Sequence, residues 1–373
     1  MYQPAITGTG VFTPSSVITN DELVAAFNAH VTRYNAENAD RIAAGEIEAK
    51  APSSSEFIHA ASGIEQRYVL DKTGVLDPDV MHPWLRERTD DEPGQMAEMA
   101  LEACRQALEM AGKTAADVDA VICAASNHER AYPAIAVEIQ NLLGIEGFGF
   151  DMNVACSSAT FGIQAAADMI RSGSIHSALV VNPEICSAHL EWRDRDCHFI
   201  FGDVCTALLI ERADSANGPH FLIKSTRLAT QFSNNIRNNN GFLRRTRKGH
   251  MEDRRDMQFM QNGRKVFKEV LPLVSRHIAA HMADENITAD NLKRLWLHQA
   301  NKTMNDYIGK RVLGRDPAPG EQPNILQDYA NTSSAGSIIA FAKYSTDLAP
   351  GDAGLICSFG AGYSVGSVIV ERA

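Results

Sequence analysis

Three polar residues, each followed by small residues, carry side chains suited to acyl-thioester chemistry. Cys156 is followed by Ser-Ser-Ala, His298 by Gln-Ala-Asn, and Asn331 by Thr-Ser-Ser-Ala-Gly. A thiol can carry an acyl group as a covalent intermediate. An imidazole and a carboxamide can donate hydrogen bonds to negative charge that develops beside it. These three residues are therefore the candidate catalytic groups.

Each candidate also has a structural explanation. Cys156 precedes a helical pattern, so its sulfur is expected at a helix N-terminus, where unpaired N–H groups favour a thiolate. The alternative is a small core residue, which we retain for the other cysteines. His298 follows the apolar run 295–297, at a strand end where α/β sheets bind ligands, but it could equally be a structural histidine. Asn331 could simply cap a helix that begins near Ser334.

A glycine-containing segment near the C-terminus, Phe359-Gly360-Ala361-Gly362, adds a backbone candidate. Glycine lets the backbone approach another group closely. The segment either forms a tight turn only or supplies an N–H group to an oxyanion hole.

Composition indicates a globular protein and limits its partners. The chain has 373 residues, of which 45% are hydrophobic and 22% are charged, enough for two domains or two fused halves. Its net charge of -11 disfavours nucleic acid as a partner but allows a local basic patch. The seven cysteines lack metal-type spacing and are expected as free thiols. No signal peptide or membrane-spanning run is found, so we expect a cytosolic protein with no membrane partner.

The chain repeats itself, which predicts two α/β halves. Residues 114–127 resemble residues 288–301, and residues 201–213 resemble the C-terminal residues 359–373 in the same order. The expected elements are helices over 92–111, 157–172 and 263–283 and strands over 178–181 and 355–359. Alternating strands and helices favour a mainly parallel sheet with helices on its faces. A turn-rich linker at 214–219 divides the chain into halves 1–215 and 216–373.

Three polar segments are expected as surface additions to this frame: 28–55, 82–94 and 232–255. The last of them holds the densest basic cluster in the chain, formed by Arg244, Arg245, Arg247 and Lys248. A cluster of this kind is either a solvated face or a docking site for an acidic partner.

A series of short motifs spans nearly the whole chain. It comprises Gly8-Thr9-Gly10 with Pro14, the segments 63–67 and 131–133, the Cys156 turn, Phe201-Gly202-Asp203, the segment 262–268, and the runs that begin at His298, Asn331 and Phe359. In this order the motifs resemble the β-ketoacyl-acyl-carrier-protein synthase III family, which has the thiolase fold. The resemblance implies two duplicated βαβαβ-type halves around a buried nucleophile helix.

The resemblance also implies a role for each candidate residue. Cys156 would be the acyl-bearing nucleophile, and His298 and Asn331 would hold the malonyl thioester carbonyl while CO2 leaves. The amides of Cys156 and Gly362 would form the oxyanion hole. Asparagine at position 331, where elongating synthases have a second histidine, implies a branch that accepts an acyl-CoA primer. The expected partners are acyl-CoA, acyl carrier protein and a second copy of the chain, and no metal or cofactor is expected.

The chain departs from the family pattern around the substrate entrance. Phe57 stands where many members have a tryptophan that stacks on the CoA adenine, and Ala61 replaces a nearby arginine. Lys302, together with Arg244 and Arg245, is the expected contact for the acidic carrier protein. These departures resemble the β-ketodecanoyl-acyl-carrier-protein synthases, a branch primed by octanoyl-CoA.

The resemblance therefore predicts decarboxylative Claisen condensation of a medium-chain acyl-CoA with malonyl-acyl-carrier-protein in fatty acid biosynthesis. Three alternatives remain open. They are an acetyl-CoA-primed initiating synthase, a condensing enzyme of secondary metabolism, and a non-catalytic partner of a true synthase. Such partners typically lack the nucleophile, so Cys156 argues against the third.

Overall fold

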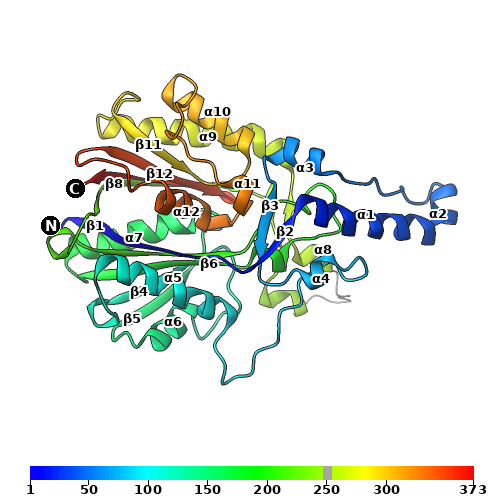
Figure 1. Ribbon diagram of the computed structural model, residues 1–373, viewed down its shortest axis with the longest axis horizontal. Coiled ribbons are helices and arrows are strands. Elements are labelled where there is room, and N and C mark those ends of the chain that lie inside the picture. Colours follow the sequence, from blue (N-terminus) through cyan, green and yellow to red (C-terminus); the bar gives the residue numbers. More distant parts are fainter. Residues whose placement is uncertain (247–253) are drawn as a thin grey trace.

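The computed structural model describes residues 1–246 and 254–373. A mixed sheet runs through this part of the chain (Figure 1), and its strand order is β11-β12-β13-β8-β1-β7-β6-β4-β5. Its strands are β1 (Pro4–Phe12), β4 (Ala120–Ala124), β5 (Phe148–Met152), β6 (Ser177–Glu184), β7 (Val204–Arg212), β8 (Phe221–Ser233), β11 (Leu292–Leu297), β12 (Ala353–Gly360) and β13 (Gly362–Arg372). Two short pairs lie outside this sheet, β2 (Ser16–Thr19) with β3 (Gln66–Val69) and β9 (Ile236–Arg237) with β10 (Met260–Gln261).

The sheet confirms the expected duplication. Strands β4-β6-β7-β1 and β11-β12-β13-β8 have the same spatial order, and corresponding neighbours run in the same relative directions. The two sets meet where β1 pairs antiparallel with β8, through Ala5 opposite Leu222 and Ile6 opposite Phe221. β5 is an additional edge strand on the first set. The expected division at residue 215 falls in a 3-10 turn, Ala213–Ser215, between β7 and β8.

Parallel pairing is less extensive than the sequence pattern suggested. Only the pairs β4–β5, β4–β6 and β11–β12 are parallel among the described strands. β6 to β7 and β12 to β13 are joined without a crossover helix, and each pair is antiparallel. As a result β7 and β13 lie nearer the centre of the sheet than β6 and β12 do.

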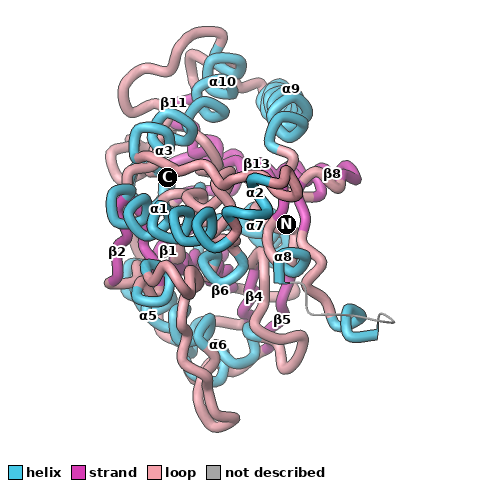
Figure 2. Tube along the Cα trace, turned by 90° about the vertical axis from the view of Figure 1, so that its right-hand side faces the viewer, coloured by secondary structure: helices cyan, strands magenta, loops and turns pink. Residues whose placement is uncertain are grey.

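Helices form layers inside and outside the strands. They are α1 (Asn20–Glu37), α2 (Ala39–Ala43), α3 (Ser55–Ser62), α4 (Thr73–Leu76), α5 (Gln95–Ala111), α6 (Ile135–Leu143), α7 (Ser158–Ser172), α8 (Arg254–Met257), α9 (Gly263–Asp284), α10 (Lys302–Leu313), α11 (Leu326–Tyr329) and α12 (Gly336–Lys343). The expected helices are confirmed as α5, α7 and α9, with ends shifted by a few residues. Figure 2 shows α5 and α6 on one outer side of the strands and α9 and α10 on the other.

The central layer contains α7 and α12, which lie between the two halves (Figure 1). Small side chains of α7, among them Ala159, Ala166 and Ala167, are fully buried against strands of both halves. Because these residues have little bulk, the two halves of the sheet can pack on one helix. The helix that begins just after Cys156 is therefore the buried nucleophile helix expected from the sequence. No helix in the described ranges is long and apolar enough to cross a membrane.

The added N-terminal segment, residues 28–55, forms the end of α1, then α2, and a loop that returns to α3 (Figure 1). Side-chain amides hold the returning loop against α1. Asn28 donates to the carbonyl of Ser53 and Asn35 to that of Lys50, each at 3.0 Å. The segment is thus an ordered extension that ends beside the candidate site.

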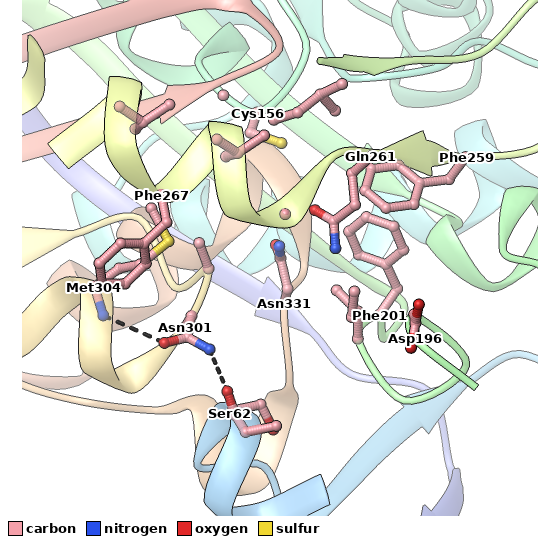
Figure 3. A pocket seen from close by; sticks show the side chains of 18 of the residues that line it. Ser62, Cys156, Asp196, Phe201, Phe259, Gln261, Phe267, Asn301, Met304 and Asn331 are labelled. Carbon is pink, nitrogen blue, oxygen red and sulfur yellow. Dashed lines mark hydrogen bonds between the residues drawn. The ribbon is translucent and has the colours of Figure 1, made fainter. Parts of the chain in front are cut away.

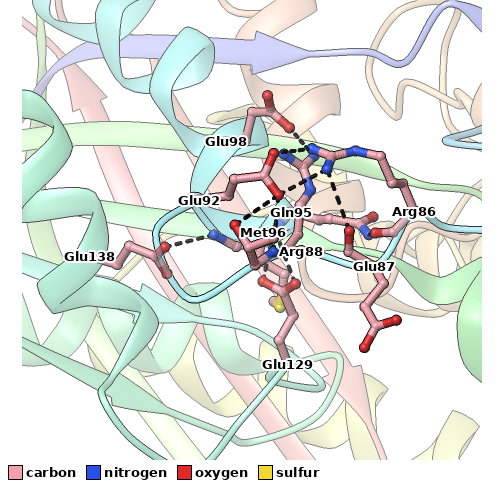
Figure 4. Close-up of polar contacts among 11 residues, drawn as sticks. Arg86, Glu87, Arg88, Glu92, Gln95, Met96, Glu98, Glu129 and Glu138 are labelled. Atoms are coloured by element: carbon pink, nitrogen blue, oxygen red, sulfur yellow. Dashed lines mark hydrogen bonds and ion pairs between the residues drawn. The ribbon is translucent and has the colours of Figure 1, made fainter.

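The added segment 82–94 is a loop fixed to its neighbours by charged groups (Figure 4). Arg88 forms an ion pair with Glu98 of α5. Glu129 accepts a hydrogen bond from the amide of Met96 at 2.9 Å, which satisfies the first turn of α5. The third addition, 232–255, includes Arg247 and Lys248, which lie outside the described residues.

Candidate active site

A cavity of about 430 Å³ brings the three candidate residues together. Cys156, His298 and Asn331 all line it, and Figure 3 shows Cys156 and Asn331 projecting toward the same space. The three come from different segments of the chain, and two of them belong to the second half. Their meeting is produced by the packing of the halves against each other.

Cys156 lies in a strained turn between β5 and α7. The amide of Val154 donates to Ser158 Oγ at 2.8 Å, and the amide of Ala155 donates to Asn153 Oδ1 at 2.9 Å. Ala155 has a φ of 49°, a conformation that residues other than glycine rarely adopt. The surrounding hydrogen bonds maintain this strain and direct the next side chain, that of Cys156, toward the cavity.

Two backbone amides, those of Cys156 itself and of Ala361, lower the pKa of the Cys156 thiol. The amide of Gly362, expected in the oxyanion hole, stays a prediction, and the structure brings the amide of the preceding residue, Ala361, to the sulfur. Gly360 permits this approach, since a Cβ there would lie 2.7 Å from the Cβ of Cys156. The pair of amides is positioned to stabilise negative charge on an acyl oxygen attached to this sulfur.

The thiol of Cys156 is protonated in the resting site. Burial raises its pKa to about 11, although hydrogen bonds from Ser333 and from the two amides act in the opposite direction. This differs from the expectation that a helix N-terminus would favour the thiolate. Desolvation is the largest cause of the raised pKa, since the sulfur lies where the two halves meet. The proton must therefore leave as the sulfur attacks.

His298 is a buried, neutral group at the end of β11. Its amide donates to the carbonyl of Cys357 at 2.7 Å, and its ring packs edge-on against Phe359 with centroids 5.1 Å apart. Burial lowers the pKa of His298 to about 4, and a backbone hydrogen bond with Ser333 opposes this only in part. The ring is consequently uncharged at neutral pH and can donate one N–H group to a substrate carbonyl.

Asn331 is held by the Phe201-Gly202-Asp203 motif of the other half. Its amide donates to the carbonyl of Ile200 at 2.9 Å, and its carbonyl accepts from the amide of Gly202 at 3.1 Å. Its Oδ1 accepts from the amide of Ser333 at 2.8 Å. This local bond corresponds to the capping alternative, but it also orients the side chain so that the NH2 group remains for the cavity (Figure 3).

Ser333 is a site residue that the sequence did not reveal. Its hydroxyl donates to the sulfur of Cys156 at 3.3 Å, and its φ is 50°. In the sequence it belongs to a polar run that is equally typical of a helix start. Nothing in that run indicates that the hydroxyl would point at a cysteine from the first half.

Phe57 lines the outer part of the cavity, but an unexpected arginine covers it. The guanidinium carbon of Arg195 lies 4.0 Å from the centre of the Phe57 ring. Arg195 also donates to the carbonyl of Pro52 at 2.7 Å, in the added segment. Because Arg195 follows β6 and lies far from Phe57 in sequence, no local pattern predicts this stack.

The expected carrier-protein contacts are only partly near the cavity. Lys302 begins α10 and pairs with Asp306 at 2.6 Å, with about half of its side chain exposed (52%). The side chain of Arg244 is nearly buried and paired with Asp256. The side chain of Arg245 lies outside the described part of the structure.

Basic residues in the first turns of α9, which were not among the expected contacts, also lie at the cavity. Arg264 lines the cavity, and Lys265 and Lys268 are exposed next to it. The segment 262–268 carries these charges in the sequence itself.

One group of potential metal ligands exists within the described residues. The ligand atoms of Cys123, His128 and Asp151 lie within 4.8 Å of one another. The Asp151 carboxylate, however, already accepts hydrogen bonds from the amides of Ile135 and Ala136, each at 2.8 Å. These bonds cap the start of α6, and we assign the carboxylate that structural role.

Comparison with known proteins places this site in a family. Models of 3-oxoacyl-[acyl-carrier-protein] synthase III and of its C-terminal part match residues 150–230 and 282–372. The β-ketodecanoyl-[acyl-carrier-protein] synthase of Pseudomonas aeruginosa is 57% identical over 348 residues, which are 93% of this chain and 99% of that protein. The β-ketoacyl-[acyl-carrier-protein] synthase III of Granulibacter bethesdensis is 30% identical over 378 residues, covering 100% of both.

The fold agrees with this similarity. The crystal structure of 3-oxoacyl-[acyl-carrier-protein] synthase III from Aquifex aeolicus aligns with a TM-score of 0.77 at 22% identity, covering 99% of each chain. Fold and site together define a condensing acyltransferase of the thiolase fold. The chain belongs to the β-ketoacyl-acyl-carrier-protein synthase III family of fatty acid biosynthesis.

Replacing Cys156 with serine should abolish covalent acyl uptake without unfolding the protein. Serine conserves the shape of the turn but is a far weaker nucleophile at its ordinary pKa. Intact-mass measurement after incubation with acyl-CoA should show one acyl group on the wild type and none on Cys156→Ser. Persistence of the acyl mass on the variant would place the nucleophile elsewhere.

The same cysteine should alkylate slowly at neutral pH. With a thiol pKa of about 11, the iodoacetamide rate at Cys156 should rise nearly tenfold per pH unit between about pH 7 and 9. The other six cysteines are buried, and Cys156→Ser provides the background rate. A plateau below pH 8 would contradict the raised pKa.

Removing the hydrogen-bond donor of His298 or of Asn331 should impair mainly the malonyl half-reaction. Loss of a donor of this kind typically lowers turnover by about 10²–10³-fold. His298→Ala and Asn331→Ala should therefore accept acyl groups from CoA but decarboxylate malonyl thioester slowly, measured as release of labelled CO2. Normal CO2 release by either variant would exclude its residue from this role.

Proposed function

We propose that the protein condenses a medium-chain acyl-CoA, with octanoyl-CoA preferred, with malonyl-acyl-carrier-protein to form a β-ketoacyl-acyl-carrier-protein. The observation that carries this proposal is the convergence of Cys156, His298 and Asn331 on one cavity, with two backbone amides at the sulfur. The proposed location of the protein is the cytosol, which its seven free cysteines support.

In the first half-reaction the sulfur of Cys156 attacks the thioester carbon of the primer. Charge develops on the thioester oxygen, where the amides of Cys156 and Ala361 can stabilise it. The carbon–sulfur bond to CoA breaks, and the proton lost by Cys156 leaves with the CoA thiol. The acyl group remains on Cys156 as a thioester.

In the second half-reaction His298 and Asn331 donate hydrogen bonds to the malonyl thioester oxygen. Their uncharged donors stabilise the enolate that forms as CO2 departs, because negative charge moves onto that oxygen. The enolate carbon then attacks the acyl carbon on Cys156. The bond to sulfur breaks, and the released thiolate takes up a proton from water to restore the resting thiol.

The primer length is proposed from the relative and from the cavity lining. A ten-carbon β-keto product, as named for the Pseudomonas aeruginosa relative, requires an eight-carbon primer when two carbons are added. The cavity wall includes apolar side chains that can contact an alkyl chain, among them Phe199, Ile200, Phe201 and Phe259. Each buried methylene contributes about 0.8 kcal/mol, so a longer chain is favoured as long as the wall accepts it.

A panel of primers tests the proposal. The kcat/KM for octanoyl-CoA should exceed that for acetyl-CoA by more than about tenfold, since six more methylenes are buried. Hexanoyl- and dodecanoyl-CoA bracket the optimum. Preference for acetyl-CoA would indicate an initiating synthase, preference for an aromatic starter a secondary-metabolite enzyme, and absence of any acyl transfer a non-catalytic partner.

The carrier protein is proposed to dock on cations around the cavity mouth. Lys302 and Arg264 lie beside the cavity, and acyl carrier protein is acidic and delivers a phosphate-bearing arm. Charges of this kind increase the rate of encounter and are screened by salt.

Charge reversal at these residues should weaken use of the carrier protein. An exposed ion pair contributes about 0.2–1 kcal/mol, so Lys302→Glu or Arg264→Glu, which also add repulsion, should raise the KM for malonyl-acyl-carrier-protein about 3- to 10-fold. Acylation by acyl-CoA should change little. Lys224→Glu is the control, because Lys224 pairs with Glu371 at the start of β8. Equal effects of all three variants would point to a nonspecific loss of charge.

We extend the proposal to a homodimer. β5 is an edge strand, and its Phe148 is 44% exposed while Tyr132 in the preceding segment is 84% exposed. An edge strand with exposed aromatic residues is suited to a second copy. Light scattering should give twice the mass of one chain, and Phe148→Asp should lower it. A monomeric wild type would contradict this.

A further inference from the structure

A buried carboxyl group that the mechanism above does not use lies behind the site. Glu184 ends β6 and is 1% exposed. Its hydrogen-bond partners among the described residues are the neutral groups of Ser126, Ser334 and Cys186. Burial raises the pKa of Glu184 to about 7. A carboxyl so enclosed is unfavourable unless its oxygens are hydrogen-bonded, so the identity of its donors is informative.

One set of donors comes from the second half of the chain. Glu184 Oε1 accepts hydrogen bonds from the amide of Ser334, at 3.2 Å, and from the hydroxyl of Ser334. Ser334 directly follows Ser333, whose hydroxyl contacts the sulfur of Cys156 and whose amide is bound by Asn331. The carboxyl therefore holds the strained turn that carries Asn331 and Ser333.

The other set of donors comes from the first half. Glu184 accepts from the amide of Ser126 at 3.0 Å and from its hydroxyl at 2.5 Å. The carbonyl of Ser126 in turn accepts from the side chain of Asn153 at 2.8 Å. Asn153 is the residue that binds the amide of Ala155, at 2.9 Å, just before Cys156. The same carboxyl is thus linked to the strained turn that carries the nucleophile.

We propose that Glu184 is a positioning residue that aligns the two strained turns, one from each half, around the sulfur of Cys156. Both turns contain a non-glycine residue with positive φ, Ala155 at 49° and Ser333 at 50°, and such conformations persist only where neighbours determine them. Figure 3 shows that Cys156 and Asn331 reach the cavity from different segments, so their relative position depends on a link between the halves. Glu184 supplies that link.

The inference rests on the proposed function, because the two turns serve different half-reactions. Ser126→Ala and Ser334→Ala form a matched pair, since each removes one hydroxyl donor and keeps the backbone donor. Loss of one hydrogen bond typically corresponds to about a 3- to 10-fold effect. Ser126→Ala should slow acylation by octanoyl-CoA by about this factor, and Ser334→Ala should slow malonyl decarboxylation.

Glu184→Ala should slow both half-reactions, by about 10- to 100-fold, because small misplacements of reacting groups are costly. Glu184→Gln keeps one acceptor oxygen and nearly the same shape, so it should recover most of that loss. Ser337→Ala is the control for removing a buried hydroxyl, since Ser337 bonds Ser358 and not Glu184. Melting temperatures are recorded for every variant.

The results separate the two proposals. A wild type that neither accepts acyl groups nor decarboxylates malonyl thioester would defeat the proposed function itself. An active wild type with Glu184→Ala unchanged in both half-reactions would overturn only the positioning role. So would serine variants that slow both half-reactions equally and in proportion to a lower melting temperature, because this pattern indicates general destabilisation. If Glu184→Ala does not fold, the split between the two serine variants decides.

Discussion

The approach of two backbone turns to the sulfur of Cys156 is the constraint on which the rest of the site depends. The turn between β12 and β13 comes so close that a side chain at Gly360 would overlap with Cys156 itself. This contact supplies the amide of Ala361 and encloses the sulfur, and the enclosure raises the thiol pKa. A hydrogen-bonded but protonated nucleophile follows from one packing contact.

The duplicated fold explains why such a contact can form. Each half places a polar turn at the end of its central strands, and the pairing of β1 with β8 joins the halves into one sheet. The Phe201-Gly202-Asp203 motif shows the consequence, because it belongs to the first half but holds the backbone of Asn331 from the second. Its Asp203 is itself buried and accepts hydrogen bonds from Leu70 and Ser187. Catalytic geometry is therefore tied to the same interface that buries the core.

The added segment 28–55 lies beside the cavity, outside the central sheet. Residues 28–55 reach the cavity through α3, where Asn301 binds the carbonyl of Ala61 at 2.5 Å, and through Pro52, which accepts from Arg195. The charged loop 82–94 is instead fixed to α5, on the outer layer.

The sequence by itself determined the duplicated α/β frame, the helix behind Cys156 and the positions of His298 and Asn331. The frame and the helix follow from internal repeats and local periodicity, which a single chain displays directly. His298 and Asn331 were singled out by the ordered motifs that resemble the family, because local pattern alone left a structural alternative for each. The tertiary structure decided the rest. Whether Ala361 or Gly362 presents its amide, and whether Ser333 faces sulfur, depends on how two distant turns pack. Arg244, which appeared as part of an exposed cluster, is paired with Asp256 for the same reason. Spacing along the chain indicates which groups are available, but only long-range packing decides which atoms meet. Each such contact joins two segments that are far apart in sequence, and that separation does not reveal how far apart they lie in space.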